Sequence, residues 1–474
     1  MDAFFKSKEF LDKLHQYEAG EAMRHGEMLW PNDLVDIADY YEQTGHRTQA
    51  LIVIKEAMKT FPGSTLPHLF YARYLLFVRG DIEGARKYSE KITDKDSSDY
   101  CLFHAELLIN DNKSGDAFVF LKQQYCKIDD EDLEEYALDA ADLLIEYEMA
   151  DEAEFFLELV SDTDSEEYKE IKGNIHVVRG EYKKSEGIFN QLLDINPFST
   201  SYWNSLASSQ FLNDDINESI KSSEYTLAIN PDDYEAMLNK ANGLYTLGNY
   251  NEAMTWYERY CEHCPEDEVG YLFRGVIYMI NDKPGKAMIM LNSAEEKAAS
   301  DSPYLVDIYH NLALVHSLLG SLKRALGYVN KAELRDSDNY GLEVVRAHIL
   351  LNSDHEKEAK MCYEKAISDS GYDPTVIIQA AISLFDSNHL MDADVRFRQL
   401  FKLKGEEWPD GHAYYARCRF AQGDYTTFMH QMRIAIRLNP NEAEAALADL
   451  FPVGTPVSDY ERYMVEVKLK GKKY

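Results

Sequence analysis

Residues 193–231 decide the fold class, and they read LDINPFSTSYWNSLASSQFLNDDINESIKSSEYTLAINP. The stretch opens and closes on one pattern, because Leu193-Asp-Ile-Asn-Pro197 is repeated as Leu227-Ala-Ile-Asn-Pro231. Pro265 follows Pro231 by the same 34 residues that separate Pro231 from Pro197. A fixed period of this length indicates a chain assembled from repeated supersecondary units.

The residues inside one unit predict two helices joined by a tight turn. In the unit that closes at Pro265, the eighth and twentieth residues are the small Ala241 and Ala253, with Gly248 between them. Small residues let crossing helices approach closely, and a bulky residue there would cost about 1–3 kcal/mol as overpacking. Glycine supplies the positive φ that ends the first helix, and proline stops the second. One hairpin cannot bury its own apolar face, so neighbouring units are expected to stack.

This pattern resembles the tetratricopeptide repeat family, and the resemblance extends over about 410 of the 474 residues. It implies an all-α fold, namely an α-solenoid of about twelve helical hairpins that forms a right-handed superhelix with a concave groove. The units begin near residues 31, 66, 98, 134, 166, 200, 234, 268, 306, 340, 374 and 409.

Three units depart from the pattern. The unit at 66 has Arg73 at its eighth position, although Ala72 stands beside it. The last unit has Phe428 at its twentieth position. The unit at 268 is about four residues too long, with extra material around residues 298–304.

The repeats divide the chain into three parts. We expect an N-terminal helix and cap over residues 1–30 and tandem repeats over 31–440. A C-terminal capping helix with a basic tail is expected over 441–474.

Composition limits the classes of function. The net charge of −34 disfavours nucleic acid as a partner, because the phosphate backbone would be repelled. No run of 18 uncharged apolar residues is present, so no membrane span is expected. The charged N-terminus does not resemble a signal peptide, and six scattered cysteines suit reduced thiols. These features predict a cytoplasmic protein.

Acidic residues concentrate in one stretch. Residues 129–170 hold nineteen Asp or Glu against a single basic residue, Lys169. Two interpretations stay open: a solvated convex face, or a docking site for a basic segment, including the C-terminal end of another copy. We call the following residues the acidic belt: Asp129, Asp130, Glu131, Asp132, Glu135, Asp139 and Asp142.

The resemblance also implies which residues bind a partner. In this family the second, fifth, ninth and twelfth residues of each first helix line the groove. The early units place acidic residues there, including Asp39, Glu42 and Glu106. Later units are polar and then apolar, and a register shift of one residue would place part of that apolar set in the core instead. The predicted groove residues of the middle and later units are Asn204, Ser208, Asn242, Tyr245, Leu272, Val276, Met279, Leu351, Ile378, Ile382 and Phe385.

Motifs for catalysis or metal binding are weak. Cys261-Glu-His-Cys264 is the one metal-like cluster, and it lacks a second ligand pair at zinc-finger spacing, so packing is the better interpretation. The fifth and ninth positions never pair Lys with Asn, so the clamp by which some tetratricopeptide domains hold a C-terminal carboxylate is not expected. No catalytic residue, metal or cofactor is predicted.

The sequence therefore predicts a non-enzymatic protein-binding scaffold. Its partners would be proteins or peptides with basic or amphipathic segments, and the oligomeric state is left open. The alternative is a peptide-sensing regulator that changes superhelix shape on binding, with a joint near residues 298–303.

Overall fold

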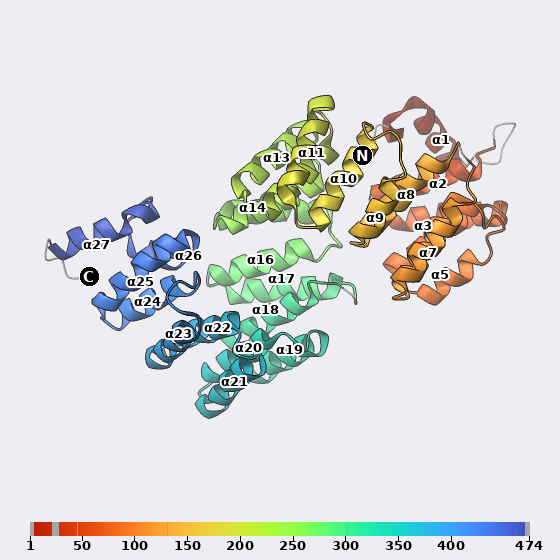
Figure 1. Ribbon diagram of the computed structural model, residues 1–474. Coiled ribbons are helices and arrows are strands. Elements are labelled where there is room, and N and C mark those ends of the chain that lie inside the picture. The colour runs from red at the N-terminus through yellow and green to blue at the C-terminus, as the bar shows by residue number, and fades with distance from the viewer. Residues whose placement is uncertain (1–3, 21–27, 45, 130, 301, 470–474) are drawn as a thin grey trace. The chain divides into compact units, whose positions relative to one another are not determined.

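The computed structural model describes residues 4–20, 28–44, 46–129, 131–300 and 302–469 (Figure 1). Within these ranges all regular structure is helical, which confirms the all-α prediction. The chain forms two compact units, residues 1–256 and 257–474, and each is described by itself. The boundary lies inside helix α15 (Tyr250–His263).

The first unit holds the N-terminal helix and the hairpins up to α14. A 3-10 turn, η1 (Phe4–Lys6), precedes α1. The helices are α1 (Lys8–Glu18), α2 (Pro31–Gln43), α3 (Arg47–Thr60), α4 (Thr65–Arg73), the π-helical turn η2 (Tyr74–Val78), α5 (Ile82–Ser89), α6 (Ser98–Asn110), α7 (Ser114–Tyr125), α8 (Leu133–Glu146), α9 (Ala150–Leu157), α10 (Glu166–Val178), α11 (Tyr182–Ile195), α12 (Thr200–Leu212), α13 (Ile216–Ile229) and α14 (Tyr234–Thr246).

The second unit continues the hairpins and ends in three shorter elements and α27. The elements are α16 (Val269–Ile280), α17 (Pro284–Lys297), α18 (Leu305–Leu318), α19 (Leu322–Arg335), α20 (Tyr340–Leu351), α21 (Glu356–Asp369), α22 (Pro374–Asp386), α23 (Leu390–Lys404), α24 (His412–Ala421), α25 (Tyr425–Leu438), α26 (Pro440–Leu447), η3 (Ala448–Leu450), η4 (Val457–Asp459) and α27 (Tyr460–Leu469).

Within each unit consecutive helices pack as hairpins, and successive hairpins pack on one another (Figure 1). In α12 and α13 the hydroxyl of Ser199 accepts a hydrogen bond from the backbone N–H of Tyr202 and so caps the first helix. Ala207 and Ser219, the eighth and twentieth residues, are fully buried. Asp214 takes a φ of 65° between the helices, where five other described units have a glycine with positive φ. The predicted hairpin solenoid is confirmed in each unit.

Glycine at the eighth position is required by close packing. A Cβ built on Gly173 would lie 2.9 Å from the ring of Phe189, and one on Gly275 would lie 2.7 Å from Leu291 Cγ. Both neighbours are fully buried, so an added Cβ would have to displace closely packed side chains. The small residues therefore set the distance between the two helices of a hairpin.

The unit near 66 departs from the pattern because its first helix begins one residue early. Counted from Thr65, Ala72 is the eighth residue and is fully buried, while Arg73 points outward. Gly80 still ends the helix, with a φ of 59°. One residue is therefore in excess, and the π-helical turn Tyr74–Val78 absorbs it, because a π turn closes over one residue more than an α turn.

Both ends of the chain contribute to the cores. Phe10 and Leu14 of α1 are buried against the α2–α3 hairpin. At the other end Tyr460 stacks on Phe451 with ring centroids 3.8 Å apart, and Met464 is buried beside them. Phe428, which replaces a small residue at the twentieth position, is buried in the same C-terminal cluster.

Candidate partner-binding grooves on the first helices

One pocket of the second unit lies on the first helices of three successive repeats. Its volume is about 500 Å³, and α18, α20 and α22 supply its walls. Leu314, Val344 and Ile382 are the ninth, fifth and ninth residues of their units, so groove positions of three repeats meet here. The full lining is Val306, Asp307, His310, Leu314, Asn339, Gly341, Leu342, Val344, Val345, His348, Gln379, Ile382, Ser383 and Asp386.

Polar groups line one side of this pocket. His348 Nδ1 lies 3.0 Å from the hydroxyl of Ser383, and that hydroxyl lies 2.6 Å from the hydroxyl of Tyr363. Burial lowers the pKa of both His348 and His310 below the ordinary histidine value. Both rings are therefore neutral at pH 7, and the pocket offers apolar walls with uncharged hydrogen-bonding groups.

The other predicted groove residues of the second unit are distributed between surface and core. Phe385 lines a neighbouring pocket of about 350 Å³ together with Tyr414 and Arg417. Ile378 is half-buried against the hydrophobic cluster of α20–α23. Leu272 and Leu351 are buried in the hydrophobic cores, and Val276 and Met279 are half-buried against the first of these. Leu351 also lines a separate pocket of about 420 Å³, which residues of α21 and α23 complete.

In the first unit the predicted polar residues form an inner network. The amide of Asn204, which is buried, donates to the carboxylates of Asp233 and Glu235 at 3.1 and 3.2 Å. Ser208 accepts a longer bond of 3.5 Å from Asn239. The remaining predicted residues of this group, Asn242 and Tyr245, are half-buried on α14.

The acidic belt divides into a loop and a helix face. Asp129, Glu131 and Asp132 are exposed between α7 and α8, and Asp130 lies outside the described residues. Glu135, Asp139 and Asp142 follow at spacings of four and three on α8, so they share one face.

That face of α8 is strongly electronegative. Desolvation raises the pKa of Asp139 to about 6, and nearby carboxylates add to the shift, including Glu135 on its own helix, Glu167 on α10 and Asp99 on α6. Asp139 itself is half-buried.

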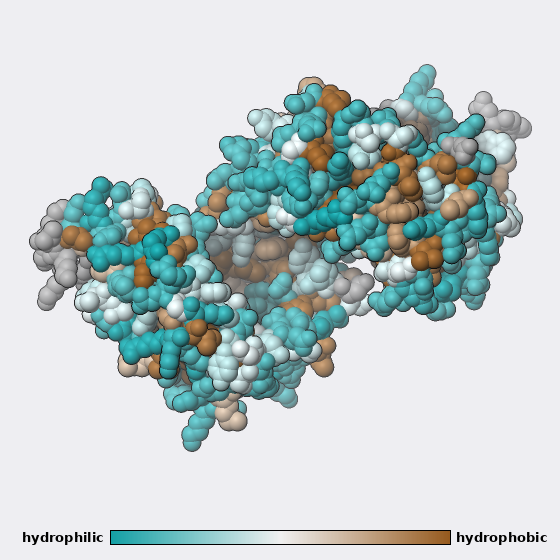
Figure 2. All heavy atoms as spheres, in the orientation of Figure 1, coloured by the Kyte–Doolittle hydropathy of each residue, from teal (hydrophilic) through white to brown (hydrophobic). Residues whose placement is uncertain are grey.

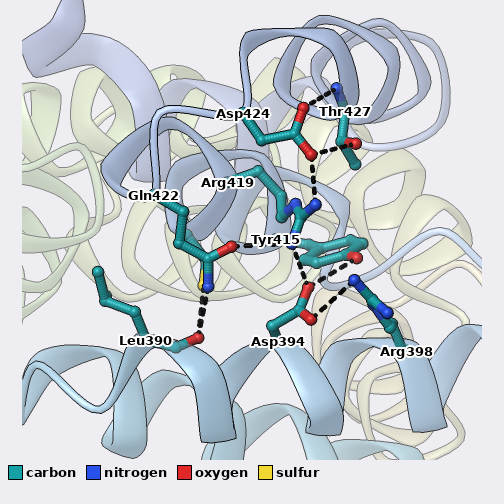
Figure 3. Close-up of polar contacts among 9 residues, drawn as sticks. Leu390, Asp394, Arg398, Tyr415, Arg419, Gln422, Asp424 and Thr427 are labelled. Carbon is teal, nitrogen blue, oxygen red and sulfur yellow. Dashed lines mark hydrogen bonds and ion pairs between the residues drawn. The ribbon is translucent and has the colours of Figure 1, made fainter.

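A polar network that the sequence analysis did not identify joins α23, α24 and α25 (Figure 3). Asp394 is 3% exposed and accepts hydrogen bonds from the hydroxyl of Tyr415 at 3.0 Å and from Arg419 at 2.8 Å. Its other oxygen pairs with Arg398 at 3.0 Å. Arg419 also pairs with Asp424. Asp394 directly follows the small twentieth residue of its unit. That position next to a buried residue is the one sequence signal that could have indicated the burial of Asp394.

The part of the chain that the structure describes contains neither a cluster of metal ligands nor an apolar helix of membrane-spanning length. No group of three or more His, Cys, Asp or Glu is arranged there to hold a metal ion. Burial raises the pKa of Cys261, and it raises that of Cys264 to about 11, so both are protonated thiols at pH 7. Among the described helices none has the length and hydropathy needed to cross a bilayer. Figure 2 shows a largely hydrophilic surface with hydrophobic residues in scattered groups.

Comparison with known proteins agrees with the repeat pattern. Family models described as tetratricopeptide repeat match residues 207–268 and 344–368. BBSome complex member BBS4 from Bos taurus is 22% identical over 230 residues, which are 48% of this chain and 44% of that protein. The chain thus matches less than half the length of this relative.

Solved structures with some similarity are also helical repeat proteins. The yeast Tom70 crystal structure has a TM-score of 0.44 at 15% identity, covering 92% of this chain and 96% of that chain. A tetratricopeptide repeat protein from Parabacteroides merdae has a TM-score of 0.44 at 15% identity, covering 56% and 98%.

Two matched repeat segments and hairpins with buried small residues at the family's positions lead to one conclusion. The chain contains tetratricopeptide repeats.

Proposed function

We propose that this chain is a non-enzymatic scaffold that binds proteins or peptides through grooves lined by its first helices. The observation that carries the proposal is the pocket on α18, α20 and α22, where Leu314, Val344 and Ile382 of three successive repeats open to one cavity. The presence of protein-interaction repeats supports it. A relative described as a member of a protein complex is consistent with it.

The pocket suits an aliphatic or aromatic anchor of a peptide. Its volume of about 500 Å³ lies within the range of roughly 300–1,000 Å³ found for specific ligand pockets. Burial of an apolar side chain against these apolar walls stabilises the complex by about 25 cal/mol for each Å² of apolar surface removed from water. The exposed Gln379 in its lining can hydrogen-bond a peptide backbone. An amphipathic helix or an extended peptide with apolar anchors meets these requirements.

The fixed scaffold is favoured over the shape-changing regulator. The connection between α17 and α18, the expected joint, is held from both sides. The hydroxyl of Ser302 donates to Glu268 at 2.5 Å, and Arg335 donates to the carbonyl of Ser300 at 2.7 Å. These contacts restrain the segment that a change of superhelix shape would have to bend.

We further propose that the chain acts in a reducing compartment such as the cytoplasm, without a cofactor. Its six cysteines are all free thiols, and three of them are buried within helical hairpins. The excess of acidic residues disfavours nucleic acid and favours partners with basic segments.

The test is selection of peptides from a random decapeptide library on the full chain. Binders are then compared on wild type and on Ile382→Asp, which places a charge in the apolar pocket. Ile289→Asp on α17 is the matched control, since Ile289 is an exposed isoleucine on a second helix. We expect Ile382→Asp to lose at least tenfold in affinity for one class of binder. Equal binding by both variants, at equal melting temperature, would refute the proposal.

A further inference from the structure

The π-helical turn Tyr74–Val78 presents two apolar side chains to solvent. Phe77 is 57% exposed and Val78 is 40% exposed, although both belong to a first helix whose other apolar residues are mostly buried. The turn exists because one excess residue must fit between Ala72 at the helix crossing and Gly80 at the helix end. π turns are rare and recur at functional sites. The question is what these two side chains contact.

A pocket of about 240 Å³ lies against the π turn. Three first-helix segments form it: α2, α4 with its π turn, and the first turn of α6. This volume is smaller than the roughly 300 Å³ at which small-molecule sites begin, so it suits a single side chain better than a cofactor. Its lining is Val35, Asp39, Glu42, Leu66, Leu69, Phe70, Arg73, Tyr74, Phe77, Val78 and Asp99.

Carboxylates ring the apolar floor of this pocket. Asp39 is half-buried, and among the described residues it has no hydrogen-bond or ion-pair partner. Glu42 has only a loose pair with Arg47 at 3.6 Å, and Asp99 is exposed. A half-buried carboxylate without a partner is costly to keep in a folded protein.

The one cation in the lining is already engaged. Arg73 donates to Glu106 on α6 at 2.9 Å, and Glu106 is itself 4% exposed. The second oxygen of Glu106, Oε2, is buried without a partner. Arg73 is thus held by an acid that still lacks hydrogen bonds, so it cannot neutralise Asp39 and Glu42 as well. The pocket keeps an excess of negative charge.

We infer that the pocket between α2, α4 and the π turn binds a protein segment in which a lysine or arginine stands next to an apolar side chain. The apolar side chain packs on Phe77 and Val78, and the cation reaches Asp39 and Glu42. The inference rests on the proposed scaffold function but uses a separate site in the other unit.

Charge selects this occupant over others. Nucleic acid and anionic lipid surfaces carry the same sign as the pocket rim and would be repelled. A purely apolar peptide would leave Asp39 desolvated without a partner, which binding would make more costly. A cation beside an apolar anchor satisfies both features of the pocket at once.

The experiment repeats the random decapeptide selection on the full-length Ile382→Asp variant, so that binders of the α18–α22 pocket drop out. Enriched peptides are resynthesised with a fluorescent label and titrated by anisotropy. Two variants test the site: Phe77→Ser, and Asp39→Asn combined with Glu42→Gln. Their matched controls are Ile52→Ser, an apolar residue 50% exposed on the second helix α3, and Asp116→Asn on α7.

We expect enriched peptides to carry Lys or Arg within three residues of an apolar residue. Phe77→Ser should weaken their binding about tenfold. The double carboxylate variant should weaken it several-fold and reduce the loss of affinity between about 0.05 M and about 0.5 M NaCl. Neither control should change affinity.

Three results would overturn the inference: no enriched peptide, enriched peptides without a cation, or peptides bound equally by wild type and both site variants. Because the selection is made on Ile382→Asp, such a failure leaves the test of the α18–α22 pocket unaffected.

Discussion

Arg73 and Glu106 link the first helices of two successive repeats, with Arg73 Nη2 lying 2.9 Å from Glu106 Oε1. The glutamate is buried and the arginine is about half-exposed. Burial raises the pKa of Glu106, while Arg73 opposes that rise by its charge and its hydrogen bond. The ion pair therefore offsets part of the free-energy cost of burying the Glu106 carboxylate.

Arg73→Met is expected to destabilise the chain at pH 7 by about 1–3 kcal/mol, because it leaves Glu106 buried without a counter-charge. The pKa of Glu106 would then rise further. Since the folded state would bind a proton that the unfolded state does not, the loss should shrink between about pH 7 and about pH 5. Urea denaturation at both values measures this. Adding Glu106→Gln should recover most of the loss, and a loss independent of pH would contradict the account.

Asp39→Asn is expected to stabilise the chain while weakening the peptide binding inferred above. Burial raises the pKa of Asp39 to about 6, with further contributions from Glu42 and Asp36 against the opposing charge of Arg73. In the unfolded chain the pKa of an aspartate is about 3.9. Between about pH 4 and about pH 6 the folded chain therefore binds a proton at Asp39 that the unfolded chain does not. Stability contributed by this group therefore falls as pH rises through that window.

The expected gain for Asp39→Asn is about 1 kcal/mol at pH 7, after allowance for solvent screening, and close to zero near pH 4. Urea unfolding of both proteins at the two pH values measures it. A destabilised Asp39→Asn at pH 7 would show that the carboxylate has a structural partner. Stability gained with binding lost is the behaviour of a residue kept for function.

Asp394→Asn tests the polar network of Figure 3. The carboxylate neutralises Arg398 and Arg419, and Arg419 is itself largely buried. Loss of the Asp394 charge from this buried ion-pair network should lower the free energy of unfolding by about 3 kcal/mol. Tyr415→Phe removes one neutral hydrogen bond to the same carboxylate and should cost about 1 kcal/mol. Denaturant midpoints of the two variants give the ratio, and equal costs would mean that charge is not the dominant contribution.

Gly173→Ala tests whether close packing of a hairpin sets the need for small residues. The new Cβ would lie 2.9 Å from the ring of Phe189, so a destabilisation of about 1–3 kcal/mol is expected. Gly187→Ala is the matched control, because Gly187 lies inside α11 with nothing within 4 Å of the added Cβ. There, alanine should stabilise the helix by about 1 kcal/mol. A stabilising effect at both sites would refute the packing argument.

The hairpin fold could be predicted because its determinants are local. Ala207 and Ser219 are small where two backbones approach, and a short sequence shows this directly. The π turn at Tyr74–Val78 was not predicted, because the excess residue becomes visible only when the crossing at Ala72 and the helix end at Gly80 are both fixed in space.

The grooves were predicted less completely than the fold. Ile382 lines a pocket, whereas Leu272 is buried in a core. A helix turns by about 100° per residue, so a small phase difference between units moves a position from groove to core. The Asp394 network joins residues 21 and 25 positions apart, and no local pattern encodes a long-range partner.

Peptides bound in the α18–α22 pocket are expected to dissociate as pH falls from about 7 to about 5. Burial lowers the pKa of His348 and His310, and an apolar anchor would desolvate both rings further. The free chain can take up protons on acidification that the bound chain resists, so affinity decreases. The neighbouring acids oppose this lowering in part, because Asp307 raises the pKa of His310 and Asp386 raises that of His348. His348→Asn should remove much of the pH dependence while largely preserving affinity at pH 7. Anisotropy titrations of one selected peptide between about pH 5 and about pH 7 measure how steeply its affinity changes with pH. An unchanged pH dependence in His348→Asn would assign the effect to His310 or exclude both histidines as its cause.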